Sequence, residues 1–318
     1  MLDAPKITVV GSANVDFVIR SERFPESGET ILGQDFAQYV GGKGANQAVA
    51  AARLGAEVSL IAAVGQDVHG ELIRVQMAKE KIDMAGLLQT QKAPTGIASI
   101  AVTKEDNKIT VIPGANHELT PAYIHEKESI ISNSDIIIIQ LEIPLEVVRT
   151  VLEIAQKHRI PTILNPAPAT VLNDEDLEKV TYLTPNISEL EELTKECKLD
   201  GTDINREFDY LFSKKIENII VTRGKDGVSF RSRKEQDIHH IQGIAVKPVD
   251  TTGAGDTFNG ALAFALIRFK DMEKAIVFAN TAAAISVTKH GAQTGMPSFT
   301  EVEECVTKTN KLQRGVSL

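Results

Sequence analysis

Residues 136–139 are four consecutive isoleucines, followed by Gln140 and Leu141. A strand with one face in water alternates apolar and polar residues, so an uninterrupted apolar run predicts a strand buried on both faces. Strands of this kind occur in parallel sheets that are covered by helices on both sides. The run therefore predicts an α/β protein.

In the rest of the chain, predicted strands alternate with predicted helices, as a parallel sheet covered by helices requires. Short apolar runs predict further strands at residues 7–10, 57–64, 161–165 and 218–222. Helical spacing or capping residues predict helices at residues 41–54, 144–157, 256–269 and 271–287. Short antiparallel strands are predicted at residues 228–230, 237–241 and 244–246. Residues 15–40 and 95–113 instead form short extended runs, which predicts a small separate sheet.

Composition narrows the class of protein. A net charge of −9 over 318 residues argues against a nucleic-acid or anionic-membrane surface. The cysteines, Cys197 and Cys305, have neither metal-ligand spacing nor a disulfide framework, which favours a reducing compartment. No apolar stretch approaches the roughly 18 residues that a membrane span needs. We therefore expect a cytoplasmic protein.

A turn of small residues precedes an apolar helix near the C-terminal end. Apolar residues recur at helical spacing from Phe258 to Phe269, so residues 253–255 form the helix start. The exposed N–H groups and the helix dipole make such a start a site for phosphate. Asp256 beside this site is best explained as the group that takes a proton from an attacking hydroxyl. The turn thus predicts a phosphotransferase; in the alternative, Asp256 only caps a core helix.

Polar residues also follow two of the predicted strands. Asn14 and Asp16 come soon after residues 7–10, and Glu142 comes directly after residues 135–141. Ligands of open α/β sheets bind beyond the carboxyl ends of strands, so these side chains are placed to reach one. Amides and carboxylates suit the hydroxyl groups of a sugar. The alternative for Asn14 and Asp16 is ordinary turn chemistry.

Two motifs resemble the signatures of a known family. Residues 250–260 read Asp-Thr-Thr-Gly-Ala-Gly-Asp-Thr-Phe-Asn-Gly, and residues 41–46 read Gly-Gly-Lys-Gly-Ala-Asn. Together they resemble the ribokinase (PfkB-type) family of carbohydrate kinases, and further matches fill the chain between them. The resemblance implies one kinase domain over residues 1–318, with a mostly parallel central sheet flanked by helices. It also implies a small β-sheet lid, from about residues 15–40 and 95–113, through which a homodimer forms.

The resemblance implies a reaction and its residues. The γ-phosphoryl group of ATP would pass to the primary hydroxyl of D-ribose, giving D-ribose 5-phosphate and ADP for ribose catabolism. Asp256 would be the general base, and the backbone N–H groups of residues 253–256 would stabilise the moving phosphoryl group. Catalytic residues are thus expected to be Gly253, Ala254, Gly255 and Asp256. Sugar-binding residues are expected to be Asn14, Asp16, Gly42, Lys43, Gly44, Asn46, Glu142 and Asp256. By itself, Lys43 could be a surface lysine in a glycine-rich turn.

The nucleotide site follows from the same resemblance. It implies contacts to ATP and its Mg²⁺ from Asn186, Glu189, Thr222, Gly224, Gly227, Gly255 and Asn280. Mg²⁺ retains waters and takes few protein ligands, so a sparse site is reasonable. Without the resemblance, Ser188 and Glu191 would be interpreted as a plain capping box.

A monovalent-cation site is also implied. Its expected residues are Asp250, Thr252, Ser286, Lys289, Gly291 and Gly295, mostly through carbonyl oxygens. Gly295 lacks the side-chain donor often found at that position, so a water would take its place and the strength of K⁺ activation stays open.

Two other kinds of function are compatible with the same motifs, and two familiar nucleotide-binding motifs are not. The same fold could act on fructose, a keto-deoxy sugar acid or a nucleoside, because a fold does not fix its substrate. A sugar-binding regulator without catalysis is a second alternative, against which Asp256 argues. A P-loop needs Ser or Thr after Lys43, where Gly44 stands. A dinucleotide-binding fingerprint needs a third glycine, where Phe258 stands.

Overall fold

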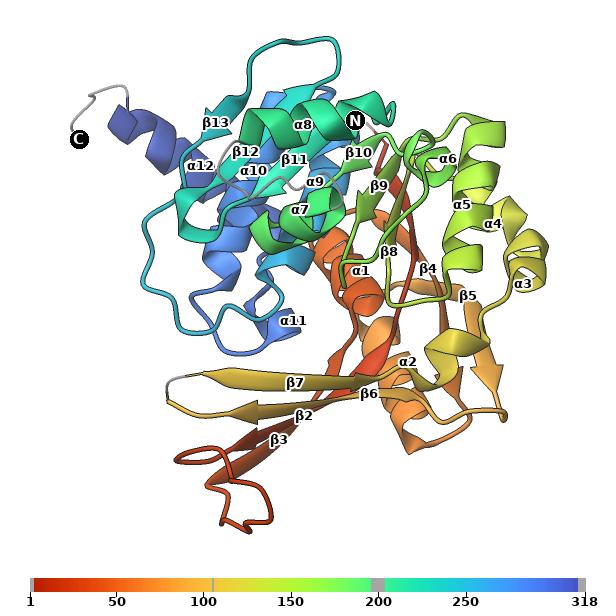
Figure 1. Ribbon diagram of the computed structural model, residues 1–318, viewed down its shortest axis with the longest axis vertical. Helices are drawn as coiled ribbons and strands as arrows, with labels where there is room; N and C mark the ends of the chain where they lie inside the picture. The colour runs from red at the N-terminus through yellow and green to blue at the C-terminus, as the bar shows by residue number, and fades with distance from the viewer. Residues whose placement is uncertain (1–2, 105, 196–203, 314–318) are drawn as a thin grey trace.

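The structure is a computed structural model that describes residues 3–104, 106–195 and 204–313, so Cys197 lies outside the described residues. Within them, one large sheet of nine strands has the order β13-β12-β11-β10-β9-β8-β1-β4-β5 (Figure 1). Its strands are β1 (Lys6–Val10), β4 (Glu57–Gly65), β5 (Asp83–Thr90), β8 (Ile136–Gln140), β9 (Thr162–Asn165), β10 (Tyr182–Leu183), β11 (Asn218–Thr222), β12 (Val228–Ser232) and β13 (His239–Ile241). The strands from β5 to β11 pair in parallel, and β12 and β13 add antiparallel pairs at one edge.

The isoleucine run shows why the sheet is covered on both faces. Ile136 and Ile138 of β8 belong to one buried cluster, and Ile137 and Ile139 belong to the other. Because successive side chains of a strand point to opposite faces, each face receives two of them. The sheet therefore separates two hydrophobic cores, as the sequence predicted.

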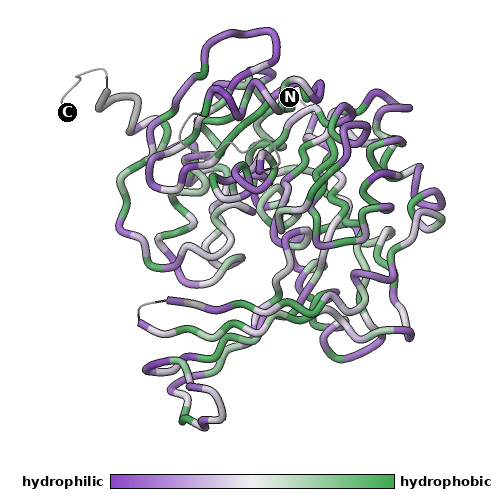
Figure 2. Tube along the Cα trace, in the orientation of Figure 1, coloured by the Kyte–Doolittle hydropathy of each residue, from purple (hydrophilic) through white to green (hydrophobic). Residues whose placement is uncertain are grey.

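Two groups of helices provide those cores. One face packs against α1 (Lys43–Arg53), α2 (Val68–Lys79), α9 (Ala254–Phe269), α10 (Met272–Ser286) and α12 (Phe299–Gln313). The other packs against α3 (Pro121–Glu126), α4 (Glu128–Ser132), α5 (Leu145–His158), α6 (Asp174–Leu177), α7 (Ile187–Thr194) and α8 (Ile204–Ser213). Two 3₁₀ turns, η1 (Gly114–Glu118) and η3 (Gly224–Asp226), and the one-turn helix α11 (Ala292–Gly295) complete the elements with given bounds in the described part of the chain. Figure 2 shows hydrophobic segments in the interior and hydrophilic ones at the outer loops.

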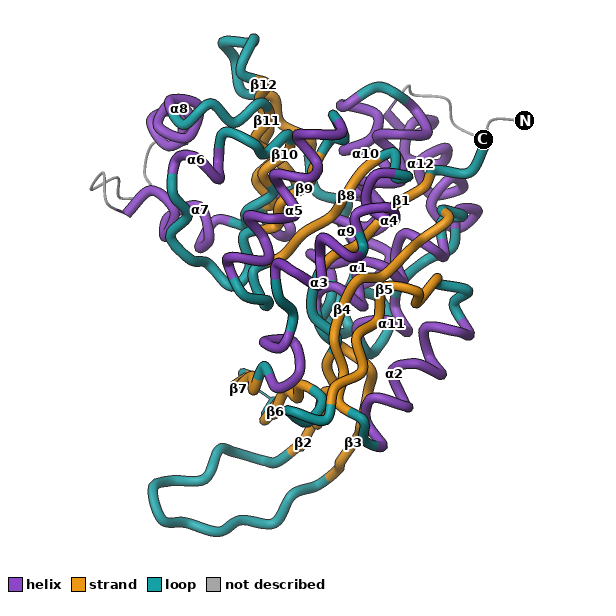
Figure 3. Tube along the Cα trace, turned by 90° about the vertical axis from the view of Figure 1, so that its right-hand side faces the viewer, coloured by secondary structure: helices purple, strands orange, loops and turns teal. Residues whose placement is uncertain are grey.

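A second, four-stranded sheet has the order β3-β2-β6-β7. Its strands are β2 (Asn14–Arg20), β3 (Asp35–Gly41), β6 (Gly96–Val102) and β7 (Asn107–Ile112). It projects from the large layer, and the loop between β2 and β3 extends beyond it (Figures 1 and 3). The predicted small sheet is therefore present.

One predicted strand is wrong. Residues 244–246, which the structure describes, form no strand; they follow β13 as irregular chain. A short apolar run cannot be assigned from periodicity alone, and Pro248 cannot donate to a sheet ladder. Among the described residues, no helix is long and apolar enough to cross a membrane.

Candidate active site

Three polar side chains lie where the two sheets meet. Asn14 and Asp16 belong to β2, which begins soon after β1 ends at Val10. Glu142 follows β8, the neighbour of β1 in the large sheet. Because parallel strands end at the same edge, the fold brings the three predicted sugar-binding residues to one junction.

A buried amide orients Asn14. Asn116 Nδ2 donates to Asn14 Oδ1 at 2.7 Å, and Asn116 Oδ1 accepts from the Ala13 N–H group at 2.9 Å. A backbone N–H group can only donate, so this contact fixes which way the Asn116 amide faces. Asn14 Oδ1 is therefore an acceptor here, and its Nδ2 group is the end that can donate to a ligand.

Ser12 and the turn at residues 42–44 lie against Glu142. Ser12 Oγ and the Lys43 N–H group both donate to Glu142 Oε2. The carboxylate thus lies at the N-terminus of α1, where the helix dipole favours negative charge. Gly42 has φ 88°, and a Cβ there would lie 2.7 Å from the Asn14 backbone nitrogen, so only glycine fits. Gly44 packs equally closely on the Ser12 backbone.

Several ionisable side chains lie close together at this junction and shift one another's pKa values. The pKa of Asp16 is raised to about 7, first by burial and then by the charges of Glu142 and Asp256, while Lys43 opposes the rise. Burial alone would lower the pKa of Lys43, but the surrounding carboxylates, led by Asp256, outweigh this effect and raise it. Lys43 is therefore a charged group among carboxylates and not a free surface lysine. An excess of acceptors suits a ligand that offers hydroxyl protons.

Asp256 does not cap its helix. The N-cap of α9 is Gly253, and Asp256 lies within the first turn with only 8% of its surface exposed. Its Oδ2 accepts from Asn46 Nδ2 at 2.9 Å, and its Oδ1 accepts from Gln47 Nε2 at 3.0 Å. The capping interpretation of Asp256 is therefore wrong, because its carboxylate faces α1.

The start of α9 offers unpaired donors. Gly253 has φ 75°, and no side chain caps the helix. The Ala254 N–H group donates to the Thr251 carbonyl at 3.3 Å, but the N–H groups of Gly255 and Asp256 lack partners within the helix, so they are available to an anion. A Cβ at Gly255 would meet no atom within 4 Å, so the approach to this turn is open.

A cavity of 620 Å³ adjoins this turn. Ala254 and Gly255 line one end of it, and five predicted nucleotide residues lie in its wall: Thr222, Gly224, Gly227, Gly255 and Asn280. Asn280 Nδ2 donates to the Gln242 carbonyl at 3.0 Å, which holds residues 243–246 along the cavity. The volume is within the range typical of small-molecule pockets.

Asn186 and Glu189 lie outside the cavity lining and form a cap. Asn186 Oδ1 accepts from the Glu189 N–H group at 2.8 Å, and Glu189 Oε2 accepts from the Asn186 N–H group at 2.9 Å. The capping box of α7 is thus made by these two residues, and the interpretation that assigned it to Ser188 and Glu191 is wrong. Burial raises the pKa of Glu189, while Asn186 and Lys43 lower it and Asp256 adds to the rise.

The residues predicted to hold a monovalent cation surround Asp250. Its Oδ2 accepts from the Gly291 N–H group, and its Oδ1 accepts from the Thr252 N–H group, both at 2.9 Å. The Ser286 carbonyl lies where a side chain at position 295 would point, so Gly295 leaves that oxygen accessible. Lys289 belongs to the turn between Ser286 and Gly291, and its side chain pairs with Glu301. Among the described residues, no group of three His, Cys, Asp or Glu side chains could hold a metal ion.

Comparison with known proteins identifies the family to which the chain belongs. The family model described as pfkB family carbohydrate kinase matches residues 4–298. The chain belongs to this family. Ribokinase of Bacillus subtilis is 43% identical over 298 residues, which cover 94% of this chain and 98% of the relative.

Solved structures of ribokinases have the same fold as this chain. Ribokinase of Thermotoga maritima has a TM-score of 0.86 and 37% identity, covering 95% of this chain and 99% of the other. Ribokinase of Arabidopsis thaliana, complexed with ribose and ATP, has a TM-score of 0.88 and 30% identity, covering 96% and 99%. The family resemblance and the α/β fold inferred from the sequence are thus confirmed for this carbohydrate kinase.

Three polar residues of the kinase were not predicted: Gln47, Asn116 and Gln293. Gln47 holds Asp256 and also donates to Asn165 Oδ1 at 3.0 Å. The contacts of Asn116 and Gln293 with Asn14 and Asn46 span 102 and 247 residues along the chain. The only sequence signal for Gln47 was its place next to Asn46 in a motif, and no local pattern indicated the other two.

Proposed function

We propose that the protein transfers the γ-phosphoryl group of ATP to O5 of D-ribose, giving D-ribose 5-phosphate and ADP. The observation that carries this proposal is the position of Asp256. Its carboxylate belongs to the polar junction, while the adjacent Ala254 and Gly255 line the 620 Å³ cavity. A hydroxyl at the junction and a phosphate in the cavity would therefore meet at the start of α9. The ribokinase relatives support ribose as the acceptor.

The reaction needs one base and stabilisation of negative charge. Asp256 takes the O5 proton as O5 attacks the γ-phosphorus, and the bond to the oxygen bridging the β- and γ-phosphorus breaks so that ADP leaves. The N–H groups at the start of α9 stabilise the charge on the transferring group. Asn14, Asp16, Lys43, Glu142 and the turn at Gly42 orient the sugar. When bound, Mg²⁺ neutralises the polyphosphate, and Asn186 and Glu189 are its proposed holders through water.

A monovalent cation is part of the proposal. Carbonyl oxygens of Thr252, Ser286, Lys289 and Gly291, with the Asp250 carboxylate, are donors of the kind that K⁺ takes. The Asp250 contacts with Gly291 and Thr252 support a site at this loop, because they already hold its two sides together. Gly295 supplies no side-chain donor, so we expect K⁺ to order the loop next to α9 without direct contact with the reaction.

The small sheet is proposed to be a lid and a dimer contact. Its face that carries Asp16 also carries Tyr39, Ile109 and Val111, whose exposures are 37%, 54% and 41%. Exposed apolar side chains can mark an interaction surface, and they also lie on the opposite face, at Ile19, Phe36 and Ile112. We assign the face that carries Asp16 to a second copy of this chain, because it is the face that adjoins the proposed sugar site. A lid over the sugar would exclude water and limit hydrolysis of ATP. The proposed location is the cytoplasm.

The test is ADP formation from MgATP in K⁺ buffer, with D-ribose, 2-deoxy-D-ribose, fructose, a keto-deoxy sugar acid and adenosine in parallel. We expect D-ribose to give the highest kcat/KM. Asp256→Asn preserves size and should reduce kcat by about 1,000-fold or more, because it removes the carboxylate that is proposed to take the O5 proton. Circular dichroism and the melting temperature of the variant control for folding.

Two results would contradict this proposal. Faster turnover with another acceptor would reject ribose while keeping the family and the base. No turnover with any acceptor in folded protein would indicate a sugar-binding protein without catalysis.

A further inference from the structure

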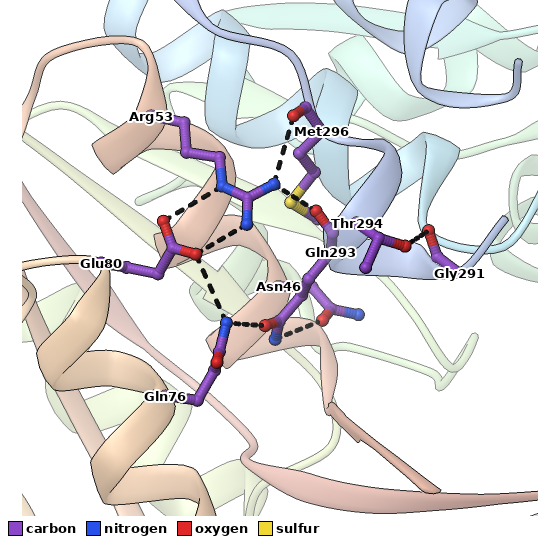
Figure 4. A network of polar contacts seen from close by, with 8 residues as sticks. All are labelled: Asn46, Arg53, Gln76, Glu80, Gly291, Gln293, Thr294 and Met296. Carbon is purple, nitrogen blue, oxygen red and sulfur yellow. Dashed lines mark hydrogen bonds and ion pairs between the residues drawn. The ribbon is translucent and has the colours of Figure 1, made fainter. Parts of the chain in front are cut away.

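Gln293 forms a second layer behind the carboxylate of Asp256. Asn46 Nδ2 donates to Asp256 Oδ2, and on the other side Gln293 Nε2 donates to Asn46 Oδ1 at 3.1 Å. Asn46 and Gln293 are only 5% and 7% exposed. Figure 4 shows the Asn46 and Gln293 side chains meeting within a larger network of polar contacts. Asn46 therefore has both amide ends engaged inside the protein.

The two ends of the Asn46 amide are not interchangeable. A carboxylate only accepts hydrogen bonds, so Asn46 must turn its Nδ2 group toward Asp256. Its oxygen then faces α11 and needs a donor, because an unsatisfied buried oxygen is costly. Gln293 Nε2 is that donor. If Asn46 turned over, its oxygen would face the carboxylate and its NH₂ group would face another NH₂ group.

The surroundings of Gln293 hold it in the same orientation. Gln76 Nε2 lies 3.5 Å from Gln293 Oε1 and 3.3 Å from Glu80 Oε1. Arg53 binds Glu80 with both Nε and Nη2, at 3.0 and 2.6 Å. Its Nη1 donates to the backbone carbonyls of Gln293 and Met296, at the end of α11 (Figure 4). Arg53 is seven residues after Asn46, so the two lie on the same side of α1.

We propose that Gln293 is a positioning residue for the phosphoryl-transfer reaction, which acts on Asp256 through Asn46. This inference rests on the proposed role of Asp256 as the base. It makes the direction of the carboxylate depend on how α11 sits on α1. Since α11 follows directly on Gly291, whose N–H group is bound to Asp250, the loop proposed to hold K⁺ is joined to the base by this path.

A double-mutant cycle tests the path. Gln293→Met keeps the length of the side chain but removes the donor to Asn46 and the acceptor for Gln76. We expect kcat to fall about 10- to 100-fold, as expected for loss of a buried hydrogen bond next to a charged group, with the KM for ATP unchanged. In an Asn46→Ala background, Gln293→Met should change kcat by less than about 3-fold, because the path is already broken.

One control variant and one further variant at position 293 separate a positioning role from a loss of stability. Thr150→Val removes a hydroxyl of similar burial that bonds only within α5, and it should leave kcat and both KM values unchanged. Gln293→Glu keeps the acceptor for Gln76 but cannot donate to Asn46, so it should lower kcat at least as much as Gln293→Met. If the effects of Gln293→Met and Asn46→Ala simply multiply, the path through Asn46 is wrong.

A crystal structure of Gln293→Met gives a readout that does not depend on turnover. We expect Asn46 to leave its 2.9 Å contact with Asp256 Oδ2. An unchanged contact overturns the proposal whatever the enzyme phosphorylates. Absence of ribose turnover in the wild-type protein would instead reject the proposed function, and the crystal structure would still decide the role of Gln293.

Discussion

Each oxygen of the Asp256 carboxylate accepts a hydrogen bond from an amide of α1, and the amide of Asn116 orients Asn14. A neutral donor fixes the direction of a carboxylate without adding a positive charge beside it. A cationic partner at the same place would hold the carboxylate in its charged form more strongly and make it a weaker base. Asn46 and Gln47 thus suit a carboxylate that has to accept a proton.

Asp16 gives a prediction about pH. Its pKa is raised from 3.8 to about 7, so the folded protein keeps a proton that the unfolded chain loses as the pH rises above about 4. Folding stability contributed by this group therefore falls between about pH 4 and pH 7 and is constant above. Asn cannot ionise. Relative to the wild-type protein, Asp16→Asn should gain about 2 to 3 kcal/mol of unfolding free energy between pH 5 and pH 8.

Urea unfolding of both proteins without sugar, at pH 5 and pH 8, checks this difference. Comparing the two proteins at each pH removes the contribution of all other titrating groups. An equal difference at both pH values would show that Asp16 is ionised in the folded protein throughout this range.

The roles of single residues were predictable where the residue follows a predicted strand or belongs to a recognisable motif. Asn14, Asp16 and Glu142 follow strands, and the carboxyl edge of a parallel sheet is where ligand contacts gather. Asn116 and Gln293 could not be found in this way, because their roles come from partners more than a hundred residues away. Their residue type also carries no signal, since polar amides are common at surfaces and in turns.

The residues at the start of α7 can be interpreted either as a helix cap or as part of the proposed Mg²⁺ site. Asn186 and Glu189 form a reciprocal cap, which is a sufficient structural reason for both residues. The charge of Glu189 interacts with Lys43 and Asp256, which connects the same cap to the active site. A cap needs an acceptor at Glu189, whereas a role toward Mg²⁺ needs its charge.

Glu189→Gln separates these two roles. Glutamine retains an oxygen that can accept from the Asn186 N–H group, so unfolding free energy should change by no more than about 0.5 kcal/mol. Loss of the negative charge should raise the Mg²⁺ concentration for half-maximal rate, by about 10-fold. Thermal unfolding and Mg²⁺ titrations of the initial rate measure the two effects, with Asn173→Ala at the cap of α6 as a control for loss of a cap alone. An unchanged Mg²⁺ requirement would assign Glu189 to the helix cap only.

The helices α1, α5, α9 and α10 and most of the buried strands were predictable, because they have regular apolar spacing or clear helix caps, whereas β5 and α2, for example, were not predicted. The irregular stretch after β13 was not, because residues 244–246 have the apolar content of a strand but line a cavity. Their surroundings, and not their sequence, decide that outcome.

The arrangement of the whole molecule follows from the alternation of strands and helices. Parallel strands need crossover helices on both faces, which accounts for the two hydrophobic cores. The place of the small sheet could be predicted in outline from the extended runs at residues 15–40 and 95–113. The parallel pairing of β2 with β6 joins runs about eighty residues apart, so its register could not be predicted from any local pattern.

The proposed dimer leads to a prediction about its dissociation constant. Ile109 is 54% exposed on the face of the small sheet that we assign to a second copy. Ile109→Asp buries a charge twice in a symmetric dimer, so the dissociation constant should rise by about 100-fold or more. Sedimentation velocity at micromolar concentration measures the change.

The neighbouring residue supplies the control. Thr110 is exposed on the opposite face of β7, so Thr110→Asp should leave the dimer intact. Equal sedimentation of the wild-type protein and Ile109→Asp would place the dimer contact elsewhere or show that the chain is monomeric.

Each half of the small sheet leaves the large layer and returns to it at the same point. Asn14 pairs with Gly41 at the base of one excursion, and the Ala115 N–H group closes the other on the Pro94 carbonyl. A segment whose two ends lie side by side can be lengthened, shortened or replaced without moving the strands that it interrupts. Evolution could therefore add or exchange this layer as two insertions, and new sugar preferences could arise while the phosphate chemistry at α9 stayed unchanged.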